Sequence, residues 1–402
     1  MLKAGFARAC ITPHAPMTLA GFDRRTALSE GVLDDLYVSV LALQTGEELP
    51  FLLCAFDLLG TDRALCENLR RALPLPQERV WICATHTHSA PRGAFSGGIS
   101  QNDGYISLLI NACKGASLSA LSDLLPAEVL QSAGEIPHVA SLRDVPRSQA
   151  DYAMPLFALT FCRPADRLRL VGIRCHPTVL DEYNLKITRD LAGFAPEDKT
   201  LVFNGACADL STRFTRSMSS EAELERLRRV LRRGMEALTD APDPACGARL
   251  CTASQELKLP YGSILQGEAR QALLADLKKQ AAACLDPAAR RELDSCIAVL
   301  ERGDRTLPQS RTVNVSACDL GSCLLLALPF EVSHADGDRL TADVSARCGK
   351  PAHLICYCGG YDGYLPHETQ GINYQDLATG YPSQARDLIW QAVLDCAANA
   401  VK

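Results

Sequence analysis

Two histidines stand two residues apart in the segment Thr85-His86-Thr87-His88-Ser89, which follows an apolar run typical of a β-strand. Side chains at positions i and i+2 of a strand point to the same face, so both imidazoles are expected to reach one point past the strand end. Such a pair can ligate a metal ion together, or one ring can ligate while the other transfers protons. On this motif alone, two exposed loop histidines remain the alternative interpretation.

Other ligand-capable side chains also follow apolar strands. His176 stands near the end of the run VGIRCHPTVL, and Glu331 follows the strongly apolar LLLAL. Tyr361 and Tyr364 lie in the glycine-rich segment CGGYDGYLPHE. Singly, such a histidine is more often a core or loop residue, and such an acid is more often a favourable charge at a helix N-terminus. Together they place polar side chains at the C-terminal ends of strands, where sites usually gather.

The elements that must position these residues alternate between strands and helices. Runs rich in β-branched and apolar residues predict strands at 36–45, 50–60 and 79–88, and helical spacing of apolar residues predicts a helix at 61–73. Further strands are predicted at 155–162, 168–175, 200–206, 312–318, 322–328 and 353–358. This mixture is typical of the α/β or α+β class rather than of an all-α or all-β protein.

Two later segments have the pattern of helices. Ser220 and Glu223 have the spacing of a capping box before the run AELERLRRVLRRGMEAL. The arginines of that run are preceded by acids and interleaved with leucines, which predicts an exposed amphipathic face rather than a nucleic-acid site. Residues 265–302 predict a helical hairpin that is broken near Pro287.

Composition excludes several classes of protein. The 402 residues carry a net charge of −6, which argues against nucleic-acid binding, and no apolar run reaches the ~20 residues of a membrane span. The N-terminus has no apolar core of secretory type, so we expect a cytoplasmic protein. In that compartment the 18 cysteines are expected to be reduced, and most of them to be small core residues. The sequence gives no indication of the oligomeric state.

The order and wording of these segments resemble the catalytic domain of the neutral/alkaline (non-lysosomal) ceramidase family. WICATHTHSAPRG resembles that family's T-H-T-H-S-[AG]-P motif, the most specific element. The other matching segments are KAGFARACITPHAPMTLAGFDRR, GVLDDLYVSVLAL, FLLCAFDLLG, NGACADLS, LPFE and GGYDGYLPHETQGINYQD, which together extend from residue 1 to about 380. Ala208, Thr212 and Phe330 depart from the family motifs. The family's C-terminal immunoglobulin-like domain is expected to have no counterpart.

The resemblance implies a fold and a set of roles. It implies one catalytic unit over residues 1–402, with two central β-sheets flanked by helices and the helical hairpin as an insertion. It implies one Zn²⁺ ion per chain, with four ligands: His86, His176, Glu331 and Tyr364.

The other residues that match the family motifs would act on the substrate. His88 would transfer protons or contact the substrate, and Ser211 would correspond to the serine of the family's G-D-x-S loop. Tyr374 would stabilise an oxyanion, and Arg143 is the best match for the family's site arginine, with Arg147 as its rival.

These roles define a hydrolase of an amide, with ceramide-like N-acyl amides of sphingolipid metabolism as the nominal substrate class, or of a related ester. Zinc would lower the pKa of water to about 7 and so generate the nucleophile. A smaller, more soluble substrate than long-chain ceramide is expected, because the sequence lacks an amphipathic surface helix and an aromatic-rich rim. If the cleft is polar and Arg143 points into it, an anionic or hydroxylated substrate is favoured.

Three other functions are alternatives. Among other zinc hydrolases with an HxH motif, the metallo-β-lactamase pattern fails because Pro91 and Arg92 occupy the positions of its Asp and His. The amidohydrolase barrel needs more histidines than this chain offers. A serine hydrolase would use Ser211, but no GxSxG elbow surrounds that residue. A catalytically silent ligand-binding relative of the same fold is the third.

Overall fold

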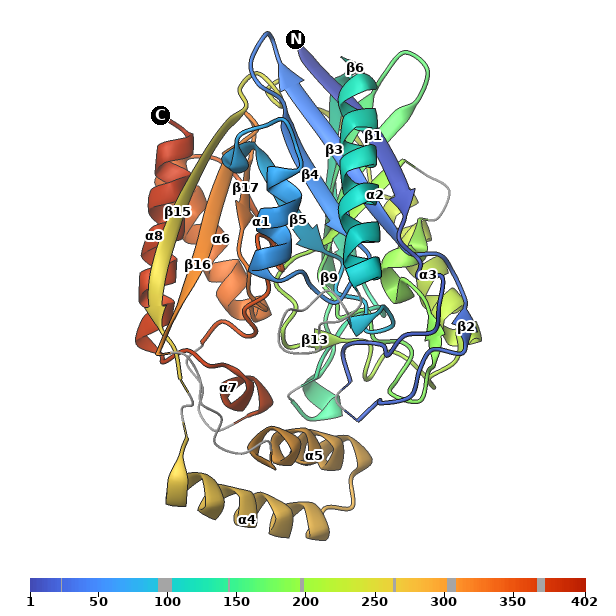
Figure 1. Ribbon diagram of the computed structural model, residues 1–402, viewed down its shortest axis with the longest axis vertical. Helices are drawn as coiled ribbons and strands as arrows, with labels where there is room; N and C mark the ends of the chain where they lie inside the picture. The colour runs from blue at the N-terminus through green and yellow to red at the C-terminus, as the bar shows by residue number, and fades with distance from the viewer. Residues whose placement is uncertain are drawn as a thin grey trace.

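The computed structural model describes residues 1–22, 24–92, 103–143, 145–195, 199–262, 265–301, 309–366 and 373–402. Three β-sheets form its framework, and helices lie outside them (Figure 1). The expected mixed α/β class is therefore confirmed, and a third sheet of four strands accompanies the two expected ones. The assignment of residues 1–402 to one catalytic domain remains a prediction.

The first sheet has five strands in the order β5-β4-β3-β1-β6. Its strands are β1 (Leu2–Cys10), β3 (Tyr37–Thr45), β4 (Phe51–Phe56), β5 (Val80–Ala84) and β6 (Leu125–Pro126). Helices α1 (Arg63–Arg71) and α2 (Asp103–Ser122) cover one face of this sheet (Figure 1). The other face packs on the second sheet.

The second sheet also has five strands, in the order β12-β10-β9-β7-β14. Its strands are β7 (Glu128–Ile136), β9 (Met154–Cys162), β10 (Arg167–Ile173), β12 (Thr200–Asn204) and β14 (Ala241–Pro242). Large apolar side chains of both sheets form the core between them, among them Trp81 from the first sheet and Phe203 from the second. The outer face of the second sheet packs on α3 (Glu221–Glu236).

The third sheet has the order β15-β16-β17-β18. Its strands are β15 (Cys251–Pro260), β16 (Ser310–Asp319), β17 (Leu324–Ala327) and β18 (Ala352–Ile355). It packs on α6 (His334–Cys348) and α8 (Gln384–Ala400). Two short pairs complete the strands, β2 (Gly31–Val32) with β11 (Lys186–Ile187) and β8 (Ser141–Leu142) with β13 (Leu210–Ser211).

One connection recurs in all three sheets. Each sheet contains one parallel pair, namely β4 with β5, β10 with β12, and β17 with β18. Parallel neighbours need a crossover, and α1, the 3-10 helix η4 (Asp190–Phe194) and α6 lie in the three crossovers. One strand of each pair is followed by a candidate residue, namely His86 after β5, His176 after β10 and Glu331 after β17. Each of the three sheets therefore contributes one of these residues.

The helical hairpin lies apart from the sheets, at the lower end of the molecule in Figure 1. It consists of α4 (Gly267–Ala283) and α5 (Pro287–Glu301), and α5 packs against the short helix α7 (Tyr374–Ala378). Residue 302, the last of the expected hairpin, lies outside the described residues. The hairpin has a small apolar core of its own, which includes Leu277, Cys296 and Leu300.

Two expectations for α3 need correction. Ser220 caps the helix by accepting from Glu223 N, but the Glu223 carboxylate accepts from Ser217 N at 2.8 Å instead of completing a capping box. Arg228 does not belong to an exposed face: its side chain is buried and pairs with Asp34 at 2.9 Å. The leucine spacing locates the buried stripe of a helix, but it does not reveal an arginine at the edge of that stripe that turns inward toward an acid.

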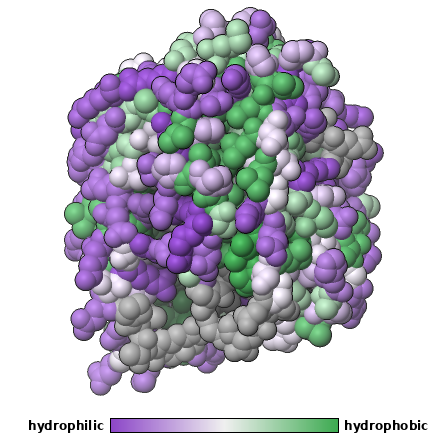
Figure 2. Space-filling model, turned by 45° about the horizontal axis from the view of Figure 1, so that its top comes forward, coloured by the Kyte–Doolittle hydropathy of each residue, from purple (hydrophilic) through white to green (hydrophobic). Residues whose placement is uncertain are grey.

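The surface and the thiols agree with the composition. In Figure 2 hydrophilic side chains dominate the face that is drawn, and hydrophobic ones gather toward its middle. None of the helices in the described part of the chain is both long and apolar enough to cross a membrane. All 18 cysteines are described, all are free thiols and most are buried, which confirms their prediction as small core residues.

Candidate metal centre

The two histidines of the HxH motif lie in a loop and not on a strand. Strand β5 ends at Ala84, and His86 adopts φ = 68°, a left-handed conformation that is unusual for a residue other than glycine. The two rings lie 5.0 Å apart. The predicted proximity of His86 and His88 is therefore observed, but a turned loop backbone produces it, and the argument from strand alternation was wrong.

His86, His176 and Glu331 converge in the interior of the protein. His176 Nε2 lies 3.0 Å from Glu331 Oε2, and His86 Nε2 lies 3.6 Å from the same oxygen. All three residues are at most 2% exposed. Ligand atoms 2.0–2.1 Å from a tetrahedral zinc ion are about 3.3 Å apart, so these spacings fit a single ion.

The hydrogen bonds that His86 and His176 make through Nδ1 leave Nε2 of each ring directed at Glu331. His86 Nδ1 donates to Leu59 O, and His176 Nδ1 donates to Cys207 O, both at 2.7 Å. In the neutral rings, each Nε2 is then an acceptor that faces a carboxylate oxygen. Three acceptors around one buried point repel one another unless a cation lies among them. Backbone carbonyls that fix the tautomer in this way are typical of metal-binding histidines.

Burial favours the neutral ring of His176. Burial, followed by the nearby Arg143, lowers the pKa of His176 to about 4. Burial alone would raise the pKa of Glu331, but His86 and His176 outweigh it and hold that pKa well below its ordinary value. The neutral ring of His176 and the ionised carboxylate of Glu331 are the forms that ligate zinc.

His88 completes a group of three histidines. The nitrogen atoms that His86, His88 and His176 offer lie within 4.8 Å of one another, so this group could hold a metal ion. Both ring nitrogens of His88 are buried and have no hydrogen-bond partner among the described residues. Burial, followed by His86 and His176, lowers the pKa of His88 well below its ordinary value. The neutral ring is therefore available as a ligand or as a proton acceptor.

The tyrosines surround Glu331 on its other side. Tyr361 donates its hydroxyl to Glu331 Oε1 at 2.5 Å. Tyr364 lies beside Glu331 through a backbone bridge, and its hydroxyl accepts from Arg143 Nη2 at 3.2 Å. The ring of Tyr374 meets that of Tyr364 edge-on, at 5.7 Å between centroids. Tyr361, which the sequence analysis singled out without a role, is thus the tyrosine hydrogen-bonded to the carboxylate.

The two rival arginines occupy different positions. Arg143 follows β8, its backbone N–H donates to Asp209 O at 2.9 Å, and its side chain reaches Tyr364. Arg147 begins the 3-10 helix η3 (Arg147–Gln149) and is exposed. Of the two, Arg143 is therefore the one that contacts the group around Glu331.

Ser211 lies beside His176 through the backbone. The two residues form a bridge, and Ser211 Oγ accepts from Arg213 N at 3.2 Å. Within the described ranges, no histidine ring lies at hydrogen-bonding distance from Ser211 Oγ. A serine nucleophile needs such a base to activate it, so the geometry does not support that role.

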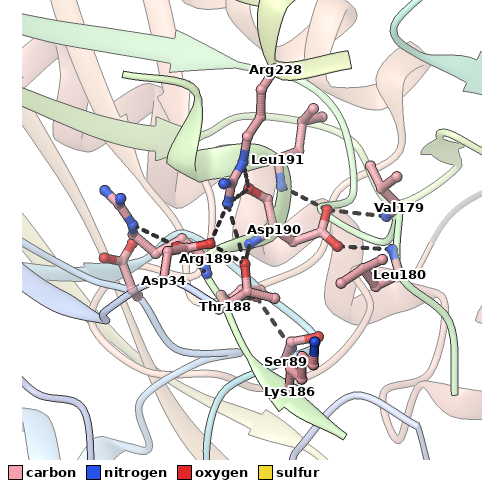
Figure 3. Close-up of polar contacts among 12 residues, drawn as sticks. Asp34, Ser89, Val179, Leu180, Lys186, Thr188, Arg189, Asp190, Leu191 and Arg228 are labelled. Atoms are coloured by element: carbon pink, nitrogen blue, oxygen red, sulfur yellow. Dashed lines mark hydrogen bonds and ion pairs between the residues drawn. The ribbon is translucent and has the colours of Figure 1, made fainter. Parts of the chain in front are cut away.

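A buried polar network holds the loops that carry the histidines (Figure 3). Asp34 accepts from Arg189 Nε at 3.0 Å and from Arg228 Nη2 at 2.9 Å. It also accepts from Thr188 Oγ1 at 2.6 Å. The backbone N–H of Thr188 donates to Ser89 O at 3.0 Å, one residue beyond the HxH motif. Asp34 thus connects α3, through Arg228, to Thr188, which in turn is bonded to the loop of the HxH motif.

Asp190 fixes the loop that follows His176. Its carboxylate accepts from three backbone N–H groups, those of Val179, Leu180 and Leu191, at 2.6 to 3.1 Å (Figure 3). Asp190 itself adopts φ = 48°. The loop therefore makes the hydrogen bonds that a buried backbone requires, without regular secondary structure.

Two further features of the site carry no sequence motif. Tyr357 stacks on His86 with 3.9 Å between ring centroids and fixes the plane of that ring. Asp209 accepts from His334 Nδ1 at 2.5 Å and from His334 N at 2.7 Å. Asp209 lies within NGACADLS, a segment that resembles a ceramidase motif, so closer attention to its acid could have found it. Tyr357 lies in the predicted strand 353–358, outside the segments that carry the resemblance.

The fold and the site together define a class of protein, a three-sheet α/β protein with a buried cluster of histidine and glutamate that could hold a metal ion. No protein-family model matches the chain, and no curated protein is similar to it in sequence.

The comparison with solved structures is more specific. Neutral ceramidase from Pseudomonas aeruginosa matches with a TM-score of 0.76 and 15% identity, over 98% of this chain and 74% of that one. A ceramidase complexed with C2 matches with a TM-score of 0.75 over the same shares of each chain, also at 15% identity. The chain therefore has the neutral ceramidase fold, which confirms the resemblance at the level of the fold.

Proposed function

We propose that this protein is a zinc-dependent hydrolase of an amide or related ester bond. One observation carries the proposal: two imidazole nitrogens and a carboxylate oxygen, all acceptors, converge on one buried point. The ceramidase fold supports it, because it is the fold of enzymes that are named for cleaving ceramide. The donor set of nitrogen and oxygen atoms suits zinc.

The proposed ligands are His86 Nε2, His176 Nε2 and Glu331, with the Tyr364 hydroxyl as the fourth. A bound zinc ion would supply a Lewis acid that polarises a carbonyl and makes water more acidic. Tyr361 holds Glu331 in place by donating to the oxygen that does not face the histidines.

The remaining residues are assigned to the substrate. Arg143, held at the Tyr364 hydroxyl, would donate to the oxyanion that develops on the carbonyl. His88 would transfer a proton to the leaving group, because its neutral ring has both nitrogens unoccupied by the described residues. Tyr374, at the edge of the Tyr364 ring, would be a second oxyanion donor.

Metal analysis of the purified protein, together with a screen of N-acyl amides and esters, tests the proposal. We expect one zinc ion per chain and hydrolysis that a chelator abolishes and zinc restores. His86→Ala should lose both the metal and the activity. His138→Ala is the matched control, because His138 is exposed and far in sequence from these ligands.

Two results would contradict the proposal. A folded protein that binds no zinc at micromolar concentrations would refute the metal centre. A His86→Ala variant that hydrolyses the same substrates at the wild-type rate would show that the chemistry lies elsewhere. A catalytically silent relative would bind one zinc ion per chain and hydrolyse none of the compounds.

A further inference from the structure

A cavity of about 870 Å³ lies between the main body and the helical hairpin. Its walls come from the segment around η3, from the loop between β13 and α3, and from α5. Figure 1 shows α5 below β13, toward the lower end of the molecule. Eleven of its 17 lining residues are polar or charged, and the described hairpin residues close one side of it. A substrate that reached the metal centre from this side would pass these side chains.

Positive charge dominates the lining. Five arginines line the cavity, Arg143, Arg147, Arg213, Arg216 and Arg291. Three acids accompany them, Asp181, Asp286 and Glu292, so the formal excess is two positive charges from five against three. The chain as a whole is acidic, at −6, and the cavity is therefore a local reversal of the protein's charge.

Two of the arginines are fixed by other parts of the protein. Arg216 Nη1 donates to Val179 O at 2.6 Å, and Arg213 Nη1 donates to Arg143 O at 3.0 Å. Burial, followed by repulsion from Arg291, lowers the pKa of Arg216. Among the described residues, no hydrogen bond or ion pair is found for the guanidinium of Arg147 or of Arg291. Both line the cavity, and no acid of the described residues pairs with either of them.

Arg143 connects the cavity to the metal centre. Its side chain lines the cavity and also donates to the Tyr364 hydroxyl, which lies beside Glu331. The side chain of Arg143 therefore spans the distance between the cavity and the metal centre. A small molecule is long enough to place one end in the cavity and the other end at the metal centre.

We propose that this cavity binds an anionic group of the substrate, so that the preferred substrate is a small N-acyl amide that carries a carboxylate, sulfonate or phosphate. The inference rests on the proposed function for the identity of the scissile bond. Arginine forks match the geometry of all three anions, and repulsion among several cations is relieved when an anion binds. A neutral substrate such as ceramide leaves that repulsion in place.

Three substrates of one chain length separate charge from acyl recognition. N-octanoylglycine carries a carboxylate, N-octanoyltaurine carries a sulfonate, and N-octanoylethanolamine is the neutral counterpart. We expect kcat/KM for at least one anionic substrate to exceed that of the neutral one about tenfold at low ionic strength, and the ratio to fall as salt screens the cavity. The anion with the higher ratio identifies the head group.

Variants then assign the preference to the cavity. Arg147→Ala with Arg291→Ala should reduce the ratio of anionic to neutral kcat/KM about tenfold, mainly through KM. Arg229→Ala with Arg233→Ala is the matched control, because both arginines are exposed on α3 and the same charge is removed. Equal reductions in both double variants would overturn the proposal, since they would reflect net charge alone.

A binding measurement separates this inference from the proposed function. Calorimetric titration of Glu331→Gln with N-octanoyltaurine should show binding that the Arg147/Arg291 double substitution weakens about tenfold. If wild-type protein hydrolyses none of the three compounds but this arginine-dependent binding is observed, the cavity is supported and the proposed function fails. If the three compounds are hydrolysed equally well, the proposed function is supported and the anionic substrate is refuted.

Discussion

Replacing Asp34 by Ala removes the acceptor on which the network behind the site depends. Asp34 is the partner of two arginines that are each 8% exposed, Arg189 and Arg228. Without it, both guanidinium groups remain buried next to each other and lose a charged acceptor. Thr188 loses the partner of its hydroxyl at the same time.

The magnitude follows from burial. Removing one partner of a buried ion pair costs about 3–5 kcal/mol, because the remaining charge is left uncompensated. The side chain of Asp34 is 17% exposed, so water partly compensates and the lower end, about 3 kcal/mol, is expected. Arg228 Nη2 and Nε also donate to Asp190 O, which limits the loss at that residue. Asp34→Asn retains an acceptor oxygen and should cost about half as much.

Urea unfolding monitored by circular dichroism measures the effect. The matched control is Asp395→Ala, because Asp395 pairs with Arg347 at 2.9 Å where both side chains are 42% exposed. Exposed pairs contribute about 0.2–1 kcal/mol, so this variant should change the free energy of unfolding little. If Asp34→Ala costs no more than Asp395→Ala, the network does not stabilise the fold as we infer.

Two further predictions concern His334 and Gly21. The hydrogen bond to Asp209 raises the pKa of His334, so the stability that this pair contributes is fully present below about pH 6.5 and is lost as the pH rises through the raised value. His334→Gln should therefore lower the free energy of unfolding by about 1 kcal/mol at pH 5.5 and by less at pH 9; a constant difference in denaturant titrations at the two pH values would refute this. Gly21 has φ = 96°, and a Cβ there would overlap the His88 ring. Gly21→Ala should cost about 2 kcal/mol and displace His88, whereas Gly46→Ala, at φ = 57° with open space around it, should cost only the backbone strain of about 1 kcal/mol. Equal unfolding midpoints and equal activities in the two variants would contradict the overlap.

Local patterns in the sequence were sufficient to predict most of the regular structure they addressed. The strands at 36–45, 168–175 and 322–328 coincide with β3, β10 and β17 to within a few residues, because apolar runs that are buried on both faces have few other conformations. No specific prediction was made for α2, α6 or α8. The long β15 was also missed, because half of its residues are polar and only Leu259 is buried, so hydrophobicity does not distinguish it.

The sequence by itself determined which residue types follow the strands of this protein. His86, His176 and Glu331 could be named from composition and position, because each follows an apolar strand and each can ligate a metal ion. Their order also supported the resemblance that the fold confirms. These are local properties, which an unfolded chain carries in its covalent order.

Only the tertiary structure decided how the residues meet. The positive φ of His86, the inward turn of Arg228 and the contact of Arg143 rather than Arg147 with Tyr364 all depend on neighbours that are distant in sequence. The arginine-lined cavity is the clearest case, because Arg143 and Arg291 line the same cavity only when the hairpin packs against the main body. Packing between distant segments sets the direction of a side chain and gathers charged side chains around one cavity. A local sequence pattern does not predict either property.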